Sequence, residues 1–220
     1  MHILVTAGNT LAMIDKVRCI TNVFTGRTGA GIALEAHARG HRVTLLTSHP
    51  DALGEETPTG LWWNLVRYKT FEDLRDRMAE LIPTGEFDAV VHCAAVSDYL
   101  SAGVYGPDRA IRSVAGKLAS DEPELWLRLV RAPKLVDRIR TEWAFRGVLV
   151  KFKLEVGPSD EQLLAIAERS RLHSKADLMV ANTLEGSAVC AFLGAGEYER
   201  VPRSALPSRL LDAIEREVSR

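Results

Sequence analysis

A cluster of hydroxyl, glycine and cationic residues stands immediately before a helical pattern near the N-terminus. Its members are Thr25, Gly26, Arg27, Thr28 and Gly29. The start of a helix offers free backbone N–H groups and the positive end of the helix dipole, and glycine lets an anion approach the backbone closely. The cluster therefore predicts a phosphate site with one added cation, and either threonine can cap the helix. The same glycines would also suit a tight turn or close helix packing, so their spacing alone leaves both interpretations open.

Polar residues also follow several short apolar runs, each of which is typical of a buried strand. These residues are Gly8, Asn9, Asp98, Lys151, Lys153 and Asn182. In open parallel sheets, ligands bind beyond the carboxyl ends of the strands, at a switch point in the strand order. We therefore expect these residues to share one rim, although Asp and Asn also serve turns without touching any ligand.

Apolar runs and helical spacings alternate along most of the chain, and they define the elements that must position these residues. Strands are expected at 3–5, 42–47, 61–68, 89–94, 125–130, 148–150 and 177–181, and helices at 29–40, 72–82, 133–143 and 159–173. We expect Pro83 and Gly85 to end the second helix and Pro133 to begin the third. The tail predicts a hairpin at 188–193 and 198–201, then a final helix capped by Ser204. Such alternation indicates an α/β, doubly wound, mostly parallel Rossmann-like sheet in a single domain over residues 1–220.

Two segments interrupt this alternation. Residues 8–24 form a loop that is too long for an idle connection, and its apolar Met13, Val17 and Ile20 favour packing against the body of the protein. Residues 97–124 are rich in glycine, proline, serine and charge, and their apolar residues show no period. This second segment is predicted to be a mobile flap.

The overall composition argues against several classes of protein. The chain carries 28 Lys and Arg residues against 29 Asp and Glu, a formal net charge of −1, which gives no reason to expect nucleic acid or a membrane surface as a partner. No apolar run approaches the roughly 18–20 residues of a membrane span, and Met1 leads directly into the first strand, so we expect a cytoplasmic protein. The three cysteines show no metal-ligand spacing.

Several segments, in order along nearly the whole chain, resemble one enzyme family. They lie at 14–22, 25–29, 94–99, 116–118, 132–136, 151–153 and 176–182. Together they resemble phosphopantothenoylcysteine synthetase, also called phosphopantothenate-cysteine ligase, of coenzyme A biosynthesis. The resemblance implies ligation of cysteine to phosphopantothenate through an acyl-nucleotide intermediate, with CTP or ATP and Mg²⁺, by a homodimer. Because the chain begins at its first strand, we expect the standalone form without a fused decarboxylase domain.

The resemblance also implies roles for individual residues. Asn22 would donate to the acyl oxygen and Lys117, on the flap, would meet the triphosphate, so both would be catalytic. Asn22 would also hold phosphopantothenate, together with Thr25, Gly26, Arg27 and Gly29. The nucleotide would contact Gly8, Asn9, His92, Cys93, Ala94, Asp98, Lys117, Pro133, Lys134, Leu135, Val136, Phe152, Arg171 and Lys175.

Three places depart from the family pattern. Residues 24–27, Phe-Thr-Gly-Arg, stand where Ser-Ser-Gly-Lys is usual, and Lys151 stands where a glycine commonly precedes the aromatic residue. In place of two lysines that are four residues apart and meet the triphosphate, this chain has Ser170 and Ser174, with the nearest cations displaced by one position. Such a shift turns a side chain by about 100° around a helix, which leaves the choice of nucleotide open.

Two other functions remain as alternatives. A short-chain NAD(P)-dependent reductase has a similar glycine pattern, but its glycines form the turn directly after the first strand. This chain also contains no Tyr-x-x-x-Lys pair and no acid after the second strand to hold a ribose. A catalytically silent relative that binds a pantothenate-like ligand is favoured by the displaced cations and disfavoured by the presence of Asn22 and Lys117.

Overall fold

A computed structural model of the chain describes residues 1–55, 57–112 and 116–220. A central sheet is built from eight strands. These are β1 (His2–Ala7), β4 (Arg42–Thr47), β5 (Trp63–Arg67), β6 (Ala89–His92), β10 (Val148–Glu155), β11 (Leu178–Thr183), β12 (Cys190–Ala195) and β13 (Glu197–Pro202). Their order is β13-β12-β11-β10-β6-β1-β4-β5. The strands from β11 to β5 are parallel, and the β12-β13 hairpin joins them as an antiparallel edge.

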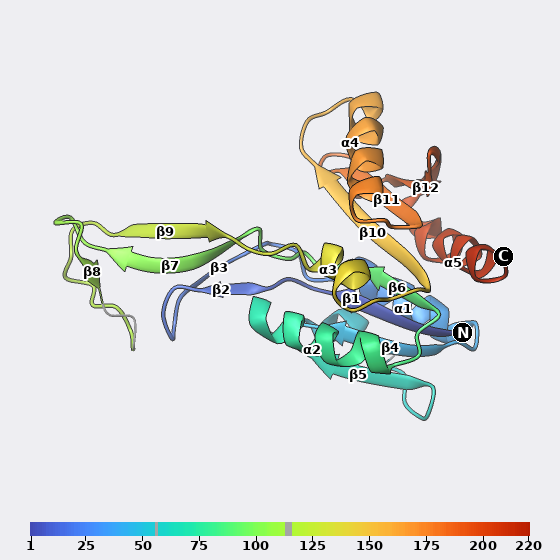
Figure 1. Cartoon of the computed structure of the whole chain (residues 1–220), viewed down its shortest axis with the longest axis horizontal. Helices are drawn as coiled ribbons and strands as arrows, with labels where there is room; N and C mark the ends of the chain where they lie inside the picture. The colour runs from blue at the N-terminus through green and yellow to red at the C-terminus, as the bar shows by residue number, and fades with distance from the viewer. Residues whose placement is uncertain (56, 113–115) are drawn as a thin grey trace.

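Helices cover both faces of this sheet (Figure 1). They are α1 (Arg27–Ala38), α2 (Phe71–Thr84), α3 (Leu135–Thr141), α4 (Asp160–His173) and α5 (Leu206–Val218), with short 3₁₀ turns η1 (Pro50–Leu53) and η2 (Arg203–Ala205). Helices α1 and α5 share a core with Ile3 and Val5, whereas α2 and α3 pack with Leu4 on the opposite face. Successive residues of a strand point to opposite faces, so a strand buried on both sides reads as a continuous apolar run. The predicted doubly wound α/β fold is confirmed.

The strand order reverses between β1 and β6. From β1 the chain proceeds outward to β4 and β5, and from β6 it proceeds in the other direction to β10 and β11. Residues beyond the two strand ends stay adjacent, because Asn9 pairs with Ala95 in a parallel bridge. This is the geometry in which open α/β sheets form their ligand crevice.

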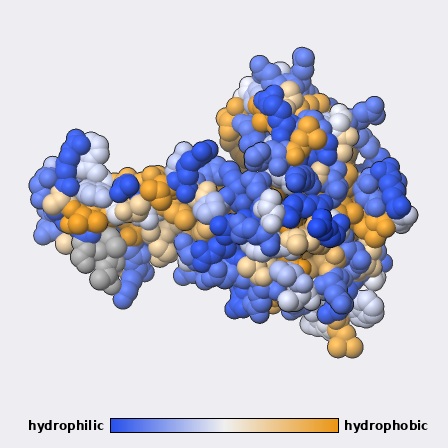
Figure 2. Space-filling model, viewed as in Figure 1, coloured by the Kyte–Doolittle hydropathy of each residue, from blue (hydrophilic) through white to orange (hydrophobic). Residues whose placement is uncertain are grey.

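A set of five further strands projects to one side of the body, and we call it the arm (Figure 1). It contains the hairpin β2 (Leu11–Met13) and β3 (Cys19–Thr21), and the three-stranded sheet β7 (Tyr99–Tyr105), β8 (Ile111–Arg112) and β9 (Trp126–Arg131). Figure 2 shows apolar side chains gathered on the arm as well as on the body. The arm therefore exposes surface that a small protein ordinarily buries.

The arm corrects two sequence predictions. The loop at 8–24 is a hairpin whose Met13, Val17 and Ile20 are exposed instead of packed on the body. The segment at 97–124 carries β7 and β8, and its three positions 113–115 lie outside the described residues. Its strand pattern was hidden because the pairing of β7 with β9 shifts register between Ser101 and Val104, with Gly103 at φ 132 between them. A bulge of this kind breaks the two-residue period on which strand prediction depends.

The predicted cap of the first helix is also wrong. Neither Thr25 nor Thr28 caps α1; Gly26 occupies that position with φ 79, in the left-handed region. Threonine seldom adopts such a conformation, because its Cβ then meets the backbone.

Helix ends elsewhere differ from prediction by small amounts. Helix α2 continues through Pro83, which costs it one hydrogen bond in the last turn, and ends at Thr84 with Gly85 as its C-cap. Pro133 precedes α3 instead of lying in its first turn. Ser204 lies within η2, and Ala205 stands at the N-cap of α5 without a side-chain bond. No helix in the described parts of the chain is long and apolar enough to cross a membrane.

Candidate active site at the switch point of the sheet

The start of α1 packs directly against the end of β1. A Cβ atom on Gly26 would lie 2.3 Å from the backbone nitrogen of Gly8, and one on Gly29 would lie 2.6 Å from Cβ of Ala7. Close packing thus requires both glycines. Among the described residues no side chain accepts a hydrogen bond from the first backbone N–H groups of α1, which therefore stay available to an anion. The packing interpretation of the glycine cluster is confirmed, and the phosphate site stays a prediction.

Guanidinium groups lie at this helix start. Arg27 is the first residue of α1 and is exposed, as is the neighbouring Thr25. Arg203, from η2 near the C-terminus, donates to Oγ1 of Thr28. Free N–H groups, a hydroxyl and cations are the groups that hold a phosphate monoester.

Asn22 links the hairpin of the arm to the end of β6. Its side-chain nitrogen donates to the carbonyl of Ala95 at 3.0 Å, and its own carbonyl accepts from Nδ2 of Asn9 at 2.5 Å. It lines a cavity of about 260 Å³ to which Asp98 and Leu129 also contribute. The structure thus brings together Asn9, Asn22 and Asp98, which are far apart in the sequence.

The base of the arm is fixed by buried hydroxyl groups. Thr10 donates from Oγ1 to Oγ of Ser97 at 3.0 Å and accepts from the Ser97 backbone N–H at 2.9 Å. Three of the four connections between arm and body are accounted for by the site: Asn22 follows β3, Asp98 precedes β7, and Arg131 ends β9. The arm and the site are therefore continuous in the chain.

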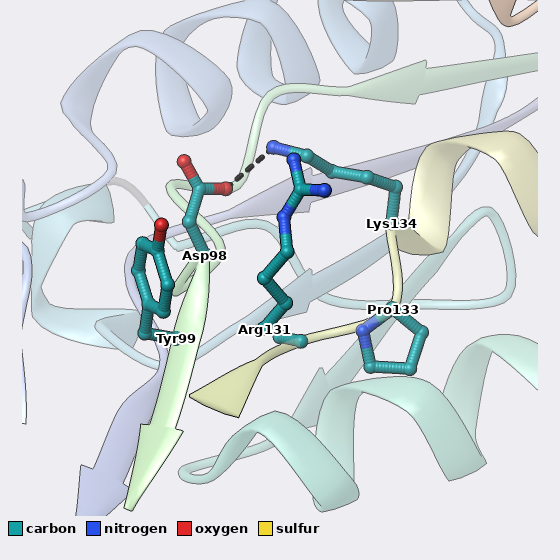
Figure 3. Close-up of a pocket in the computed structure, with 6 residues that line it drawn as sticks. Asp98, Tyr99, Arg131, Pro133 and Lys134 are labelled. Carbon is teal, nitrogen blue, oxygen red and sulfur yellow. Dashed lines mark hydrogen bonds and ion pairs between the residues drawn. The ribbon is translucent and has the colours of Figure 1, made fainter. Parts of the chain in front are cut away.

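Asp98 and Lys134 form an ion pair that lines a second cavity, of about 480 Å³ (Figure 3). Lys134 Nζ lies 2.5 Å from Oδ1 of Asp98, and Arg131 and Tyr99 stand beside them. The two paired side chains are 57% and 65% exposed. Exposed ion pairs contribute little to stability, so both charges are free to meet a ligand.

A third cavity, of about 500 Å³, joins the ends of β6 and β10 to α3 and the last turn of α4. It contains eight of the residues that the sequence assigned to a nucleotide: His92, Ala94, Asp98, Pro133, Lys134, Leu135, Val136 and Phe152. It also contains residues that the sequence did not assign, namely Arg131, Lys151, Lys153, Ser170 and His173. A pocket with an aromatic wall and several cations suits a base with attached phosphates.

Burial sets the protonation of two residues at the end of β6. Burial, together with the nearby positive charge of Lys151, lowers the pKa of His92 to about 4. His92 is therefore neutral at pH 7, with Nδ1 3.0 Å from the hydroxyl of Thr6. Burial also raises the pKa of Cys93 to about 12, so this thiol stays protonated and is no nucleophile.

Lys117 lies on the arm, away from these cavities. The segment that carries it is held at the β2–β3 turn, where the Lys16 N–H donates to the carbonyl of Gly116 at 3.2 Å. That turn is about four residues along the hairpin from Asn22, which corresponds to roughly 10–15 Å. Lys117 thus does not line any of the three cavities described above.

The two displaced cations near α4 also lie outside the third cavity. Arg171 donates to both carboxylate oxygens of Glu168, at 2.9 and 2.7 Å, and to the carbonyl of Ala176 at 2.8 Å. Lys175 is exposed on the turn after α4, with φ 52. Gly8 likewise serves the packing of α1 described above. The structure thus does not bring Arg171 or Lys175 into this cavity, although both were expected to contact the nucleotide.

The residues that the sequence missed carried only weak signals. Arg131 directly precedes the segment 132–136, and Lys151 was expected at the ligand rim and noted as a departure, but it was not assigned to the nucleotide. The described residues contain no group of three or more His, Cys, Asp or Glu side chains arranged to hold a metal ion. A Mg²⁺ ion carried by a triphosphate takes most of its ligands from phosphate and water and needs one or two carboxylates at most. The exposed Asp98 fits that requirement.

Comparisons with known proteins agree with this architecture. The chain is 34% identical over 222 residues, 98% of its length, to the coenzyme A biosynthesis bifunctional protein CoaBC of Thermococcus kodakarensis, of which the match covers 51%. The crystal structure of the DNA/pantothenate metabolism flavoprotein from Streptococcus pneumoniae superposes with a TM-score of 0.86 at 27% identity, covering 98% of this chain and 99% of that one. A Cab2 variant in complex with phosphopantothenate-cysteine shares the fold, with a TM-score of 0.76 at 15% identity over 99% of this chain and 86% of that one.

The extent of these matches defines a family. The chain spans about half the length of its curated relative. Residues 1–194 match the model of the DNA/pantothenate metabolism flavoprotein C-terminal domain, which is most of the chain. This protein belongs to the family of DNA/pantothenate metabolism flavoprotein C-terminal domains.

Proposed function

We propose that this chain is a phosphopantothenate-cysteine ligase of coenzyme A biosynthesis. The observation that carries the proposal is the cavity that Asn22 shares with Asp98, beside the glycine-rich start of α1 and the nucleotide-sized cavity at β6 and β10. An acyl transfer between two substrates needs this arrangement, with an anion site and a nucleotide site that meet at one polar donor. The similarity to CoaBC and the phosphopantothenate-cysteine bound to the Cab2 variant support the same reaction.

The first step joins two anions. The carboxylate of phosphopantothenate attacks the α-phosphorus of a nucleoside triphosphate, a P–O bond forms, and pyrophosphate leaves. Fixed N–H groups and cations offset the repulsion between the reactants. Arg27 and the start of α1 would hold the phosphate of the pantothenate arm, and Arg131 and Lys134 would hold the nucleotide.

The second step forms the amide. The amine of cysteine attacks the acyl carbon, the nucleoside monophosphate leaves, and the proton from the amine goes to solvent or to the departing phosphate. Negative charge develops on the acyl oxygen, where Asn22 would donate a hydrogen bond. An amide suits this task because it donates without carrying charge or exchanging a proton.

We further propose that Mg²⁺ enters with the triphosphate, which is CTP or ATP. The four common nucleoside triphosphates, assayed for pyrophosphate release with phosphopantothenate and cysteine, would identify the co-substrate. Turnover should require both phosphopantothenate and cysteine, and NAD(P)H should have no effect. NADPH binding without any triphosphate-dependent pyrophosphate release would instead favour a reductase, and binding of phosphopantothenate without turnover would favour a silent relative.

The arm supports the further proposal of a homodimer. It carries exposed apolar residues on several strands and on the β2–β3 turn: Val17, Ile20, Tyr99, Ile111, Trp126, Leu129 and Val130. Exposed apolar patches with aromatic residues are typical of protein interfaces. A second copy of the chain on this surface would also bring its own Lys117 near the first copy's site region.

A further inference from the structure

Lys151 is a cation of the third cavity that has only neutral partners. Its ammonium group donates to the carbonyl of Ser170 at 3.1 Å and to Oγ of Ser174 at 2.5 Å. Ser174 in turn donates to Oδ1 of Asp137 at 2.6 Å, so the nearest carboxylate is reached only through a hydroxyl. Within the described parts of the chain, Lys151 forms no ion pair of its own.

The other two lysines of the cavity are already paired. Lys134 lies 2.5 Å from Asp98, and Lys153 lies 2.7 Å from Glu155. Burial lowers the pKa of Lys151, Asp137 raises it, and the positive charges of Lys134 and Lys153 lower it again. A half-buried ammonium among other cations is an unfavourable arrangement unless an anion joins it.

Ser170 and Ser174 stand where the resemblance places two lysines that meet a triphosphate. The ammonium of Lys151 reaches those same two residues from the neighbouring strand β10, at a position where the family commonly has glycine. In this chain a positive charge on the strand thus reaches the place where the resemblance puts positive charges on the helix. The Arg171 side chain does not substitute for it, because it is held by Glu168 and the carbonyl of Ala176.

We propose that Lys151 binds the triphosphate in this chain, beside Arg131 and Lys134 and in place of lysines on α4. The proposal rests on the ligase function proposed above and names one of its nucleotide-binding residues. The hydrogen bonds to Ser170 and Ser174 hold the ammonium ready, and a phosphate oxygen entering the cavity takes over one of them. The rigid strand keeps the charge at the polyphosphate end of the site, next to His92 and Phe152.

A purely structural role makes a different prediction. The carbonyl of Ser170 belongs to the last turn of α4, so Lys151 could act only as a cap for that helix. Removing a cap lowers the melting temperature and leaves the affinity of folded protein for a nucleotide unchanged. Removing a ligand cation weakens nucleotide binding at any temperature below melting.

The test compares Lys151→Met with Arg169→Met, which removes one positive charge from the exposed surface of the same helix end. Calorimetric titration with CTP and with ATP should show affinity reduced about 10- to 100-fold in Lys151→Met, as for a lost hydrogen bond to a charged group, and unchanged in Arg169→Met. The KM for phosphopantothenate should stay the same, because its phosphate site is at α1. The double variant Lys151→Gly with Ser174→Lys, which returns the charge to the helix, should recover most of the nucleotide affinity.

Each outcome decides the matter. Nucleotide affinity unchanged in Lys151→Met, or no recovery in a folded double variant, overturns the role of Lys151 even if the wild type is an active ligase. If nucleotide affinity falls as expected in Lys151→Met but the wild type shows no triphosphate-dependent turnover, the anion-binding role of Lys151 stands and the proposed ligase function is overturned. If Lys151→Met does not fold, the double variant distinguishes nucleotide binding from helix capping. It restores the positive charge without restoring the bond from residue 151 to the carbonyl of Ser170.

Discussion

Oδ2 of Asp15 accepts a hydrogen bond from the backbone N–H of Leu118 at 3.0 Å, although the two residues are 103 positions apart. Arg18, which is paired with Asp15, donates to the carbonyl of Leu118 at 2.8 Å. The turn of the β2–β3 hairpin is thereby joined to the segment that carries Lys117. The position of a predicted catalytic lysine thus depends on one buried carboxylate.

Replacing that carboxylate should release the segment. Hydrogen bonds from the backbone of Leu118, Val17 and Arg18 keep the pKa of Asp15 well below its usual range. Because this pKa is depressed, the stabilisation from the Asp15 carboxylate is fully present above the pKa of Asp in an unfolded chain, about 3.9. It is lost as pH falls further, through the pKa of Asp15 in the folded protein. The protection of the Leu118 amide, measured as its exchange rate relative to an unfolded chain at the same pH, should therefore stay constant from neutral pH down to about pH 5 and fall only below about pH 4. Asp15→Asn should exchange fast at pH 7, and slow exchange in this variant would mean that other contacts hold the segment.

Asn22→Asp should separate the two half-reactions. The change keeps the size of the side chain, removes the donor and adds repulsion where charge develops on the acyl oxygen. The second step should slow by about 10²–10³-fold, as for a lost oxyanion donor, while pyrophosphate is still released once per site. Rapid quench should then detect a bound acyl nucleotide. If pyrophosphate release slows as much as product formation and no intermediate accumulates, Asn22 serves the bond to Ala95 and not the chemistry.

Lys117→Ala should slow formation of the acyl nucleotide by about 10²-fold or more, with melting unchanged, because the side chain is exposed. Since Lys117 lies beside the hairpin turn and not at its own cavity, we expect it to act in the site of a second copy. Mixing Lys117→Ala with Asn22→Asp would then give heterodimers with one intact site and a partial return of turnover. Absence of any return in confirmed heterodimers would show that the arm closes on its own subunit.

Trp126→Glu should weaken self-association. Trp126 is 51% exposed on the arm and lies under the guanidinium of Arg109, 5.5 Å from the ring centroid. A carboxylate there would be desolvated in an apolar interface, which costs several kcal/mol. Sedimentation velocity should show a dimer for the wild type and a monomer for the variant at the same concentration. Leu61→Glu, at a 96% exposed position of the body, is the matched control and should remain dimeric.

Residues of the body could be predicted from the sequence because both faces of its strands are buried. Ile3, Leu4 and Val5 form a continuous apolar run for that reason, and the strand at 42–47 has the predicted bounds. Of the arm, the sequence predicted only β9, as a strand at 125–130, since the other strands are short or exposed and the bulge near Gly103 removes the period of β7. The sequence placed Lys151 at the ligand rim and assigned Phe152 to the nucleotide. The bonds of Lys151 required the structure, because only the structure shows that β10 reaches the last turn of α4.

The continuity of arm and site limits how the length of this chain can change. Adding one residue to β3, β7 or β9 between the arm and the body would turn every following side chain to the opposite face, and Asn22, Asp98 or Arg131 would leave its cavity. Among the described residues, the hydrogen bonds of the turn at 106–110, between β7 and β8, are all local, so this turn can accept extra residues without that effect. Related chains should therefore differ in length at the tip of the arm and keep a constant number of residues at its base.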